Sequence, residues 1–240
     1  MIKDQFGVNV TGITVATLVF TILVGLAILY CLHLLSPYRQ SPKQDDNKPA
    51  WIAIFGSLFF VAIALVFSIF TKIHPLSTFA LSPLALVQSV VTLIPMLIML
   101  TILKKTTHPH FTAFRDKQIE VFSKIGFRFT PMRIFLMSLG AGIGEEMLFR
   151  GALQGWLSEF SPIILAIALP AVIFGALHNA NLTYMVIASL IGVYLGVSFV
   201  ITDNIAVPIM AHALYDIIAL HSTSVLIVAR NQGNTQSLGL

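Results

Sequence analysis

Two adjacent carboxylates followed by an arginine are the residues best suited to chemistry. Glu146 and Arg150 lie four residues apart with the acid first, the favourable order for an ion pair on one helix, so each is expected to neutralise the other. Glu145 points about 100° away from its neighbour around a helix and cannot easily share that arginine. A carboxylate without a neutralising partner in a low-dielectric site accepts protons readily. Glu145 is therefore the candidate general base.

A second group of candidates lies further along the chain, at His178, His212 and Asp216. His212 and Asp216 are also four residues apart, so the carboxylate can orient or charge the imidazole. Phe174 precedes His178 by one helical turn and can pack against its ring. Each feature also has a structural interpretation, since buried Glu–Arg pairs and membrane histidines often only join helices, and a His–Asp pair also suits a proton relay. Their occurrence together favours a catalytic site.

The elements that carry these residues are apolar blocks long enough to cross a bilayer. The chain is 57% hydrophobic and only 10% charged, whereas a soluble domain has about 25% charged residues. Blocks of about 20 apolar residues predict an all-α, polytopic bundle of about seven transmembrane helices, since a membrane β-barrel shows short alternating segments. The last span could continue through His221–Ala229. The predicted spans are Val10–Leu35, Trp51–Phe70, Pro83–Leu103, Met132–Leu157, Pro162–Ala180, Leu182–Val200 and Ile205–Leu220.

Glycine spacing distinguishes the two halves of the chain. Small residues one turn apart let membrane helices approach closely, and pairs of glycines at this spacing occur only in the C-terminal half, at Gly140/Gly144, Gly151/Gly155 and Gly192/Gly196. We predict that the last four spans form the catalytic core. Within one membrane domain, residues 1–130 would then supply peripheral helices and a basic loop, 131–222 the core and 223–240 a tail. An internal repeat typical of transporters is not evident.

The basic residues indicate topology rather than a nucleic-acid partner. Of the 14 Lys and Arg, most lie in the loops after the first and third spans. The positive-inside rule then places both loops and the C-terminus in the cytoplasm and the N-terminus outside. The longest connection, Lys104–Thr130, mixes aromatic and basic residues and fits either a helix in the headgroup layer or a covered cytoplasmic loop. The single cysteine, Cys31, excludes an internal disulfide.

The motifs together resemble one family. Residues 145–150 match EExxxR, Phe174 and His178 match FxxxH, and His212 and Asp216 match HxxxN/D. Their order and spacing, over about Met132 to Leu220, are similar to the CPBP family, the CAAX proteases and bacteriocin-processing enzymes, also called Abi. The resemblance implies an intramembrane endopeptidase in the cell membrane, here expected in a bacterial inner membrane. Its partners would be membrane lipid and a membrane-associated or lipid-tethered substrate reached from the cytoplasm.

The resemblance also implies roles for the candidate residues. Glu145 and His178 would activate water, and His212 with residue 216 would stabilise the oxyanion. Glu146 and Arg150 would support the geometry. CAAX-processing members carry Asn where this chain has Asp216, and an ionised carboxylate only accepts hydrogen bonds. We therefore expect Asp216 to act through His212, by keeping it an imidazolium donor.

Several alternatives stay open at this level. A metal-free glutamate mechanism is favoured and no cofactor is expected, but Glu145, His178 and His212 could bind a catalytic zinc ion. HExxH, which places two histidines on one helical face, is absent. Rival functions are a non-catalytic scaffold or bacteriocin self-immunity protein and a small proton-coupled transporter.

The predicted spans carry one geometric conflict. Glu145 would lie about 20 Å from the cytoplasmic end of its helix, at about 1.5 Å per residue. His178 falls near the cytoplasmic end of its own span. Their convergence therefore requires tilted, kinked or offset helices, or different span boundaries.

Overall fold

The computed structural model describes residues 48–124, 129–178 and 180–237, and all the elements assigned within them are helices. The predicted helical fold class is thereby confirmed. The first predicted span, Val10–Leu35, lies outside the described residues, as does Cys31. The helices are α2 (Lys48–Thr71), α3 (Pro83–Lys105), α4 (Pro109–Lys124), α5 (Pro131–Glu146), the π-helix η2 (Met147–Gln154), α6 (Gly155–Ser158), α7 (Ile163–Leu177), α8 (Leu182–Thr202) and α9 (Ala206–Ser237).

The long helices are apolar enough for a membrane. Among the described residues, three are long and hydrophobic enough to cross a bilayer, namely Pro83–Lys105, Leu182–Thr202 and Ala206–Arg230. Gly56–Thr71 and Ile163–Leu177 are shorter apolar helices. Because large hydrophobic side chains on these helices face outward, the chain is a multi-pass membrane protein.

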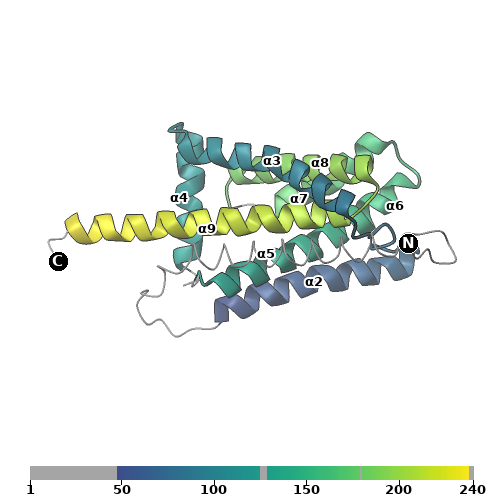
Figure 1. Cartoon of the computed structure of the whole chain (residues 1–240), viewed down its shortest axis with the longest axis horizontal. Coiled ribbons are helices and arrows are strands. Elements are labelled where there is room, and N and C mark those ends of the chain that lie inside the picture. The colour runs from purple at the N-terminus through teal and green to yellow at the C-terminus, as the bar shows by residue number, and fades with distance from the viewer. Residues whose placement is uncertain (1–47, 125–128, 179, 238–240) are drawn as a thin grey trace, which may run out of the picture.

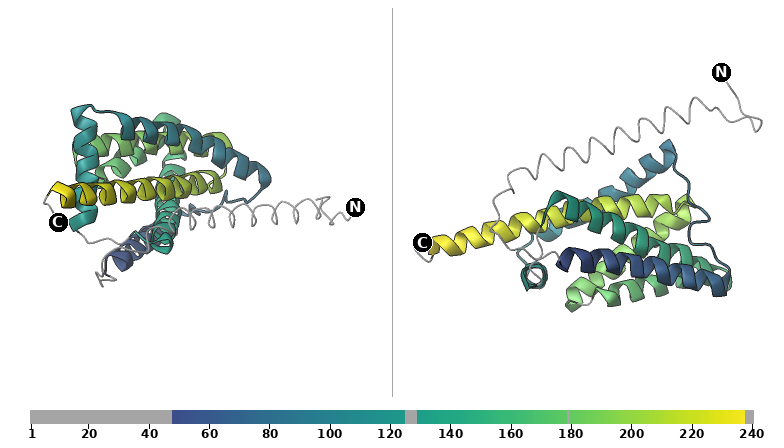
Figure 2. Two further views of the ribbon diagram at one scale, coloured as in Figure 1. Left: turned by 60° about the vertical axis from the view of Figure 1, so that its left-hand side comes forward. Right: turned by 90° about the horizontal axis from the view of Figure 1, so that it is seen from below.

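The axes of the long helices are broadly aligned, and α4 lies across them at one end of the bundle (Figure 1). The closest pairs are α7 with α8, α5 with α9, α2 with α5, and α3 with α9. Two helices of the N-terminal half, α2 and α3, therefore pack directly against helices that carry the motifs. α9 continues beyond α4 to Ser237, well past the predicted end at Leu220 (Figures 1 and 2).

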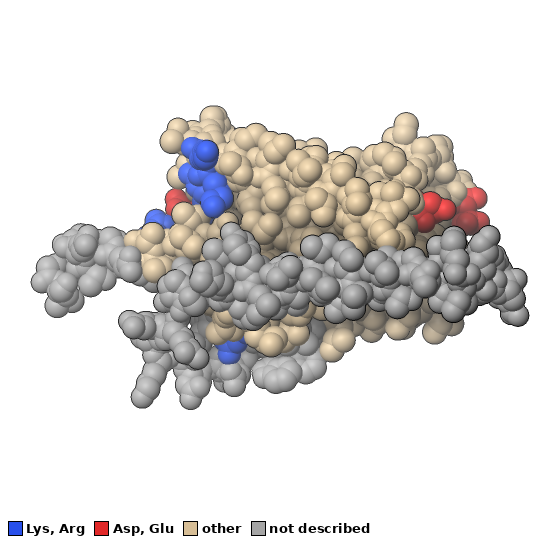
Figure 3. All heavy atoms as spheres, viewed as in Figure 1, with Lys and Arg blue, Asp and Glu red and all other residues tan. Residues whose placement is uncertain are grey.

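Charged side chains are segregated along the bundle. On the face seen in Figure 3, Lys and Arg gather at the end where α4 crosses, and most visible Asp and Glu lie at the opposite end. Among the described residues visible between these ends on that face, no Lys, Arg, Asp or Glu is seen. An apolar band between two charged ends is the pattern expected of a membrane-spanning bundle.

The predicted span Met132–Leu157 is one continuous helical stretch with a change of pitch. It begins with Thr130, whose hydroxyl accepts a hydrogen bond from the backbone N–H of Arg133 at 3.3 Å, and with Pro131 in the first turn. After Glu146 the helix widens into the π-helical segment Met147–Gln154. Short π-helical segments within α-helices frequently mark functional sites.

Two of the glycine pairs allow close helix packing, as predicted, but one of them joins a helix outside the last four spans. A Cβ on Gly144 would lie 2.6 Å from the carbonyl oxygen of Ser57 on α2. A Cβ on Gly192 would lie 3.1 Å from Cα of Ala171, which joins α8 to α7. The first contact extends glycine-mediated packing to the N-terminal half.

The connection after α3 contains the helix α4. Its location in the headgroup layer stays a prediction. Its residue Phe114 is buried with Leu103 of α3 and Ile187 of α8, so this aromatic side chain packs on protein. Arg115 donates to the carbonyl oxygens of Leu103 and Thr106, at 2.6 and 2.8 Å, and so caps the end of α3. α4 is thus fixed across one end of the bundle.

Candidate active site

The predicted ion pair lies at the centre of the bundle. Arg150 Nη1 donates to Glu146 Oε1 at 2.9 Å, and both side chains are almost fully buried, with exposures of 1% and 0%. Arg150 Nη2 donates to the carbonyl oxygen of Gly192 on α8 at 2.8 Å. Its guanidinium lies 5.1 Å from the centre of the Phe174 ring on α7.

His212 joins this pair from α9. Its Nδ1 lies 2.7 Å from Glu146 Oε1, the same oxygen that accepts from Arg150. With Nδ1 donating to the carboxylate, the orientation of the imidazole is fixed. We call Glu146, Arg150 and His212 the ion-pair cluster. Sequence spacing predicted the first pair but not the bond to His212, whose position 66 residues away gives no local signal.

The opposite edge of the His212 ring, at Nε2, lies near two further carboxylates. Nε2 lies 3.5 Å from Asp216 Oδ2, so the predicted His212–Asp216 pairing is present. The same nitrogen lies 4.0 Å from Glu145 Oε2. The side chains of Glu145 and Asp216 are 13% and 26% exposed, in contrast to the sealed Glu146. Glu145 is therefore separate from the Glu146–Arg150 pair, as the helical geometry predicted.

His178 approaches from the end of α7. Its Nδ1 lies 2.8 Å from the carbonyl oxygen of Phe174, so the tautomer that donates there leaves Nε2 as a free acceptor. The imidazole lies over the Phe174 ring, with centroids 4.6 Å apart. Phe174 also contacts His212, at a centroid separation of 6.1 Å. Phe174 is thus a shared wall for both histidines, which extends its predicted packing role.

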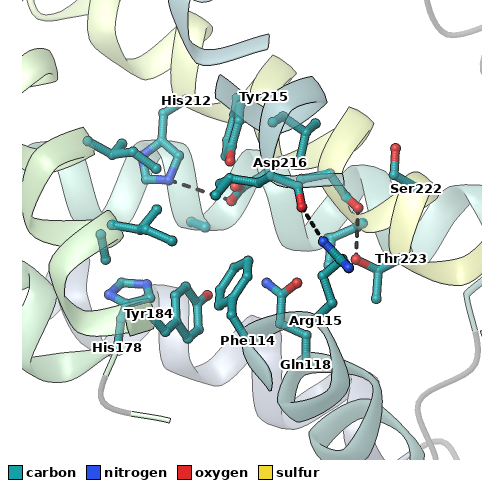
Figure 4. A pocket seen from close by; sticks show the side chains of 18 of the residues that line it. Phe114, Arg115, Gln118, His178, Tyr184, His212, Tyr215, Asp216, Ser222 and Thr223 are labelled. Carbon is teal, nitrogen blue, oxygen red and sulfur yellow. Dashed lines mark hydrogen bonds and ion pairs between the residues drawn. The ribbon is translucent and has the colours of Figure 1, made fainter. Parts of the chain in front are cut away.

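The candidate residues line a single cavity. Glu145, Phe174, His178, His212 and Asp216 all contribute to its wall, and its volume is about 250 Å³. Figure 4 shows His212 and Asp216 on one side and His178 with Tyr184 on the other. Glu146 and Arg150 do not line it. The cavity extends toward α4, where Phe114, Arg115, Gln118 and Phe122 line it.

The short length of α7 resolves the conflict between the predicted depths of Glu145 and His178 in the membrane. This helix has 15 residues, fewer than the roughly 20 that cross a bilayer. It ends at Leu177 rather than at the predicted Ala180, and His178 caps it with its ring turned back toward Phe174. His178 therefore lies within the bundle, on the same cavity as Glu145.

Some lining residues had no signal in the sequence. Tyr184 and Tyr215 come from α8 and α9, and Gln118 comes from α4. Tyr215 directly precedes Asp216, so its place could have been expected from adjacency. Tyr184 and Gln118 belong to no motif and are brought in by the packing of α4 on α8.

The donor set does not fit the three-ligand zinc site considered above. In the described part of the chain, no group of three or more His, Cys, Asp or Glu side chains is arranged to hold a metal ion. His212 already directs Nδ1 to Glu146, and its Nε2 lies 3.5 Å from Asp216 Oδ2 and 4.0 Å from Glu145 Oε2.

Comparison with known proteins supports the resemblance drawn from the motifs. Residues 127–218 match the family model described as type II CAAX prenyl endopeptidase Rce1-like. This match confirms the predicted CPBP, or CAAX protease, family for the region that holds every candidate residue. No curated protein and no solved structure matches the chain.

Proposed function

From the premise that the motif region of this chain is of the Rce1-like, CAAX protease family, we propose that the protein is an intramembrane endopeptidase. Its substrate would be a membrane-associated or lipid-tethered protein or peptide. The family supports a CAAX-type protease activity in general. The proposal rests above all on one observation: a carboxylate and two imidazoles from three helices line one cavity, while the neighbouring carboxylate is sealed away in an ion pair.

Glu145 is the proposed general base. It takes a proton from a water molecule in the cavity, and the oxygen attacks the scissile carbonyl carbon. His178, with Nε2 free to accept, orients that water. When the C–N bond breaks, the leaving amine takes a proton from the acid form of Glu145. Each proton removed from water thus ends on a product, and the site returns to its starting state.

His212 is the proposed stabiliser of the oxyanion. Glu146 accepts from Nδ1, so only the imidazolium form also presents an N–H at Nε2. Asp216, 3.5 Å from Nε2, favours that charged form by its own negative charge. In this mechanism Asp216 acts through His212 and takes the place of an amide that would donate directly. A preorganised cation in a low-dielectric site is a strong stabiliser of developing negative charge.

The substrate would approach from the end of the bundle where α4 crosses. The basic residues gathered there support a cytoplasmic location of that end under the positive-inside rule (Figure 3). The cavity reaches α4 and Lys104, at the basic end of α3. A segment of a membrane-tethered substrate would enter this end while its anchor stays in the bilayer. The C-terminus would then also be cytoplasmic.

The experiment that tests this function compares membrane proteomes of cells that carry wild-type protein or Glu145→Ala. The wild type should generate a new N-terminus in at least one membrane protein that is missing with the variant. Glu159→Ala serves as a matched control, because Glu159 is exposed, lies outside the three motifs and does not line the cavity. Identical sets of N-termini in all three strains, with the phenotype retained in Glu145→Ala, would instead support a scaffold.

Metal dependence is tested separately on purified protein. We expect elemental analysis to find less than one zinc ion per chain and a chelator to leave peptidase activity intact. Stoichiometric zinc, with activity lost on chelation and restored by zinc, would overturn the glutamate mechanism.

A further inference from the structure

The catalytic histidine on α7 has a second aromatic neighbour that no motif includes. The ring of Tyr184, on α8, lies 5.6 Å from that of His178 at an interplanar angle of 70°, an edge-to-face contact. Phe174 contacts His178 at a centroid distance of 4.6 Å and an angle of 36°. The imidazole is therefore held between two aromatic rings from two helices. Edge-to-face contacts of this kind favour one ring orientation.

His178 depends on such contacts because of its place in the chain. It is the C-cap of α7, so the helix continues on only one side of it. Tyr184, by contrast, is firmly anchored: its backbone N–H donates to the side chain of Asn181 at 2.8 Å, in the N-cap of α8. A fixed ring on α8 thus supports an imidazole at a helix end.

Tyr184 also belongs to both apolar clusters on this side of the molecule. One cluster contains Phe149 and Phe174 beside the site, and the other contains Leu103 and Phe114 at the junction of α3 and α4. Its ring packs edge-to-face on Phe114 of α4, with centroids 5.2 Å apart. Figure 4 shows its hydroxyl directed toward Phe114 and Gln118, away from His178.

We propose that Tyr184 is a positioning residue: its ring holds the His178 imidazole in its working orientation and ties that orientation to the packing of α4 across the cavity. The inference rests on the proposed function for the role of His178, but the contact itself does not. Because the hydroxyl points away from His178, the ring and not the hydroxyl carries the effect. Tyr184 makes no contact with reacting atoms in this proposal.

The test modifies histidines of the full-length protein in detergent with diethyl pyrocarbonate, and mass spectrometry of peptides follows each residue. Tyr184→Leu should raise the modification rate of His178 several-fold relative to that of His212, whereas Tyr184→Phe should match the wild type. His212 is buried, so general unfolding would accelerate both histidines and would not raise the modification rate of His178 relative to that of His212. Tyr194→Leu is the matched control, since Tyr194 lies on the same helix and bonds instead to the Thr92 carbonyl.

Peptidase kinetics provide the second measurement. Tyr184→Leu should lower kcat by about ten- to a hundredfold with little change in KM, because a small misplacement of a catalytic group has an effect of that size. Tyr184→Phe should restore most of it. An unchanged His178 modification ratio in Tyr184→Leu, or equal defects in the Leu and Phe variants, would overturn the proposal. A wild type without peptidase activity would overturn the proposed function and leave the modification experiment to decide the positioning role.

Discussion

Glu145 and Glu146 are neighbours of identical chemistry, yet they lie in opposite environments. Glu146 belongs to the ion-pair cluster, buried against Arg150 and His212 and connected through Arg150 to Gly192. Glu145 faces the cavity, and its nearest described cationic partner is His212 Nε2 at 4.0 Å. A helix turns by about 100° per residue, so adjacent side chains necessarily face different neighbours. One helix therefore supplies both a member of the ion-pair cluster, Glu146, and the proposed reactive group, Glu145.

Substitution of Glu145, which lines the cavity, should have the largest effect on peptidase activity. Glu145→Gln keeps the shape of the side chain but removes the proton acceptor, so the peptidase rate should fall by about 10²- to 10⁴-fold. The thermal midpoint should stay close to wild type, because Glu145 makes no close ion pair with Arg150. Initial rates with a cleaved membrane substrate and melting curves in detergent measure both. A variant that loses stability and activity together would erase the distinction between the two glutamates.

The ion-pair cluster should show the largest effect on stability. Glu146→Gln leaves Arg150 buried without its carboxylate, which typically costs about 3–5 kcal/mol. It also removes the acceptor at His212 Nδ1. Chemical or thermal unfolding in detergent measures the loss, with Glu145→Gln as the matched control. If the two variants unfold alike, the cluster does not support the fold as described.

Substitutions of Asp216 test whether its charge affects activity through His212, which also contacts the ion-pair cluster. Asp216→Ala removes the charge near Nε2 and should lower the peptidase rate by about 10²-fold, as expected for weakened oxyanion stabilisation. Asp216→Asn should retain more activity, because an amide can donate to the oxyanion directly. Parallel rate measurements decide the matter. A wild-type rate in Asp216→Ala would count against a role that runs through His212.

The smallest effect is expected one turn beyond the cluster. Gln154 Nε2 donates to the carbonyl oxygen of Gly196 at 3.0 Å, parallel to the bond from Arg150 to Gly192. Gln154→Met keeps the length of the side chain and should cost only about 0.6–1.7 kcal/mol, the range of hydrogen bonds between membrane helices. Peptidase activity should be unaffected. A strong loss of activity in this variant would extend the functional region beyond the cavity.

The sequence by itself determined what depends on local spacing. Four-residue separations placed Arg150 beside Glu146 and Asp216 beside His212, because such residues share one helical face. The apolar blocks predicted the helices, and the three motifs predicted the family. Boundaries were predicted less well. The early end of α7 leaves no distinct mark in a continuously apolar sequence, and α9 continues through polar residues beyond its apolar segment.

Only the tertiary structure decided which helices meet. The bond between Glu146 and His212 joins residues 66 positions apart, and that between Arg150 and Gly192 joins residues 42 apart. Neither follows from periodicity, because periodicity fixes the face of a helix but not the partner opposite it. The same holds for Tyr184, which meets His178 because α4 and α7 both pack on α8. Helix packing therefore converted a set of local pairs into one enclosed site.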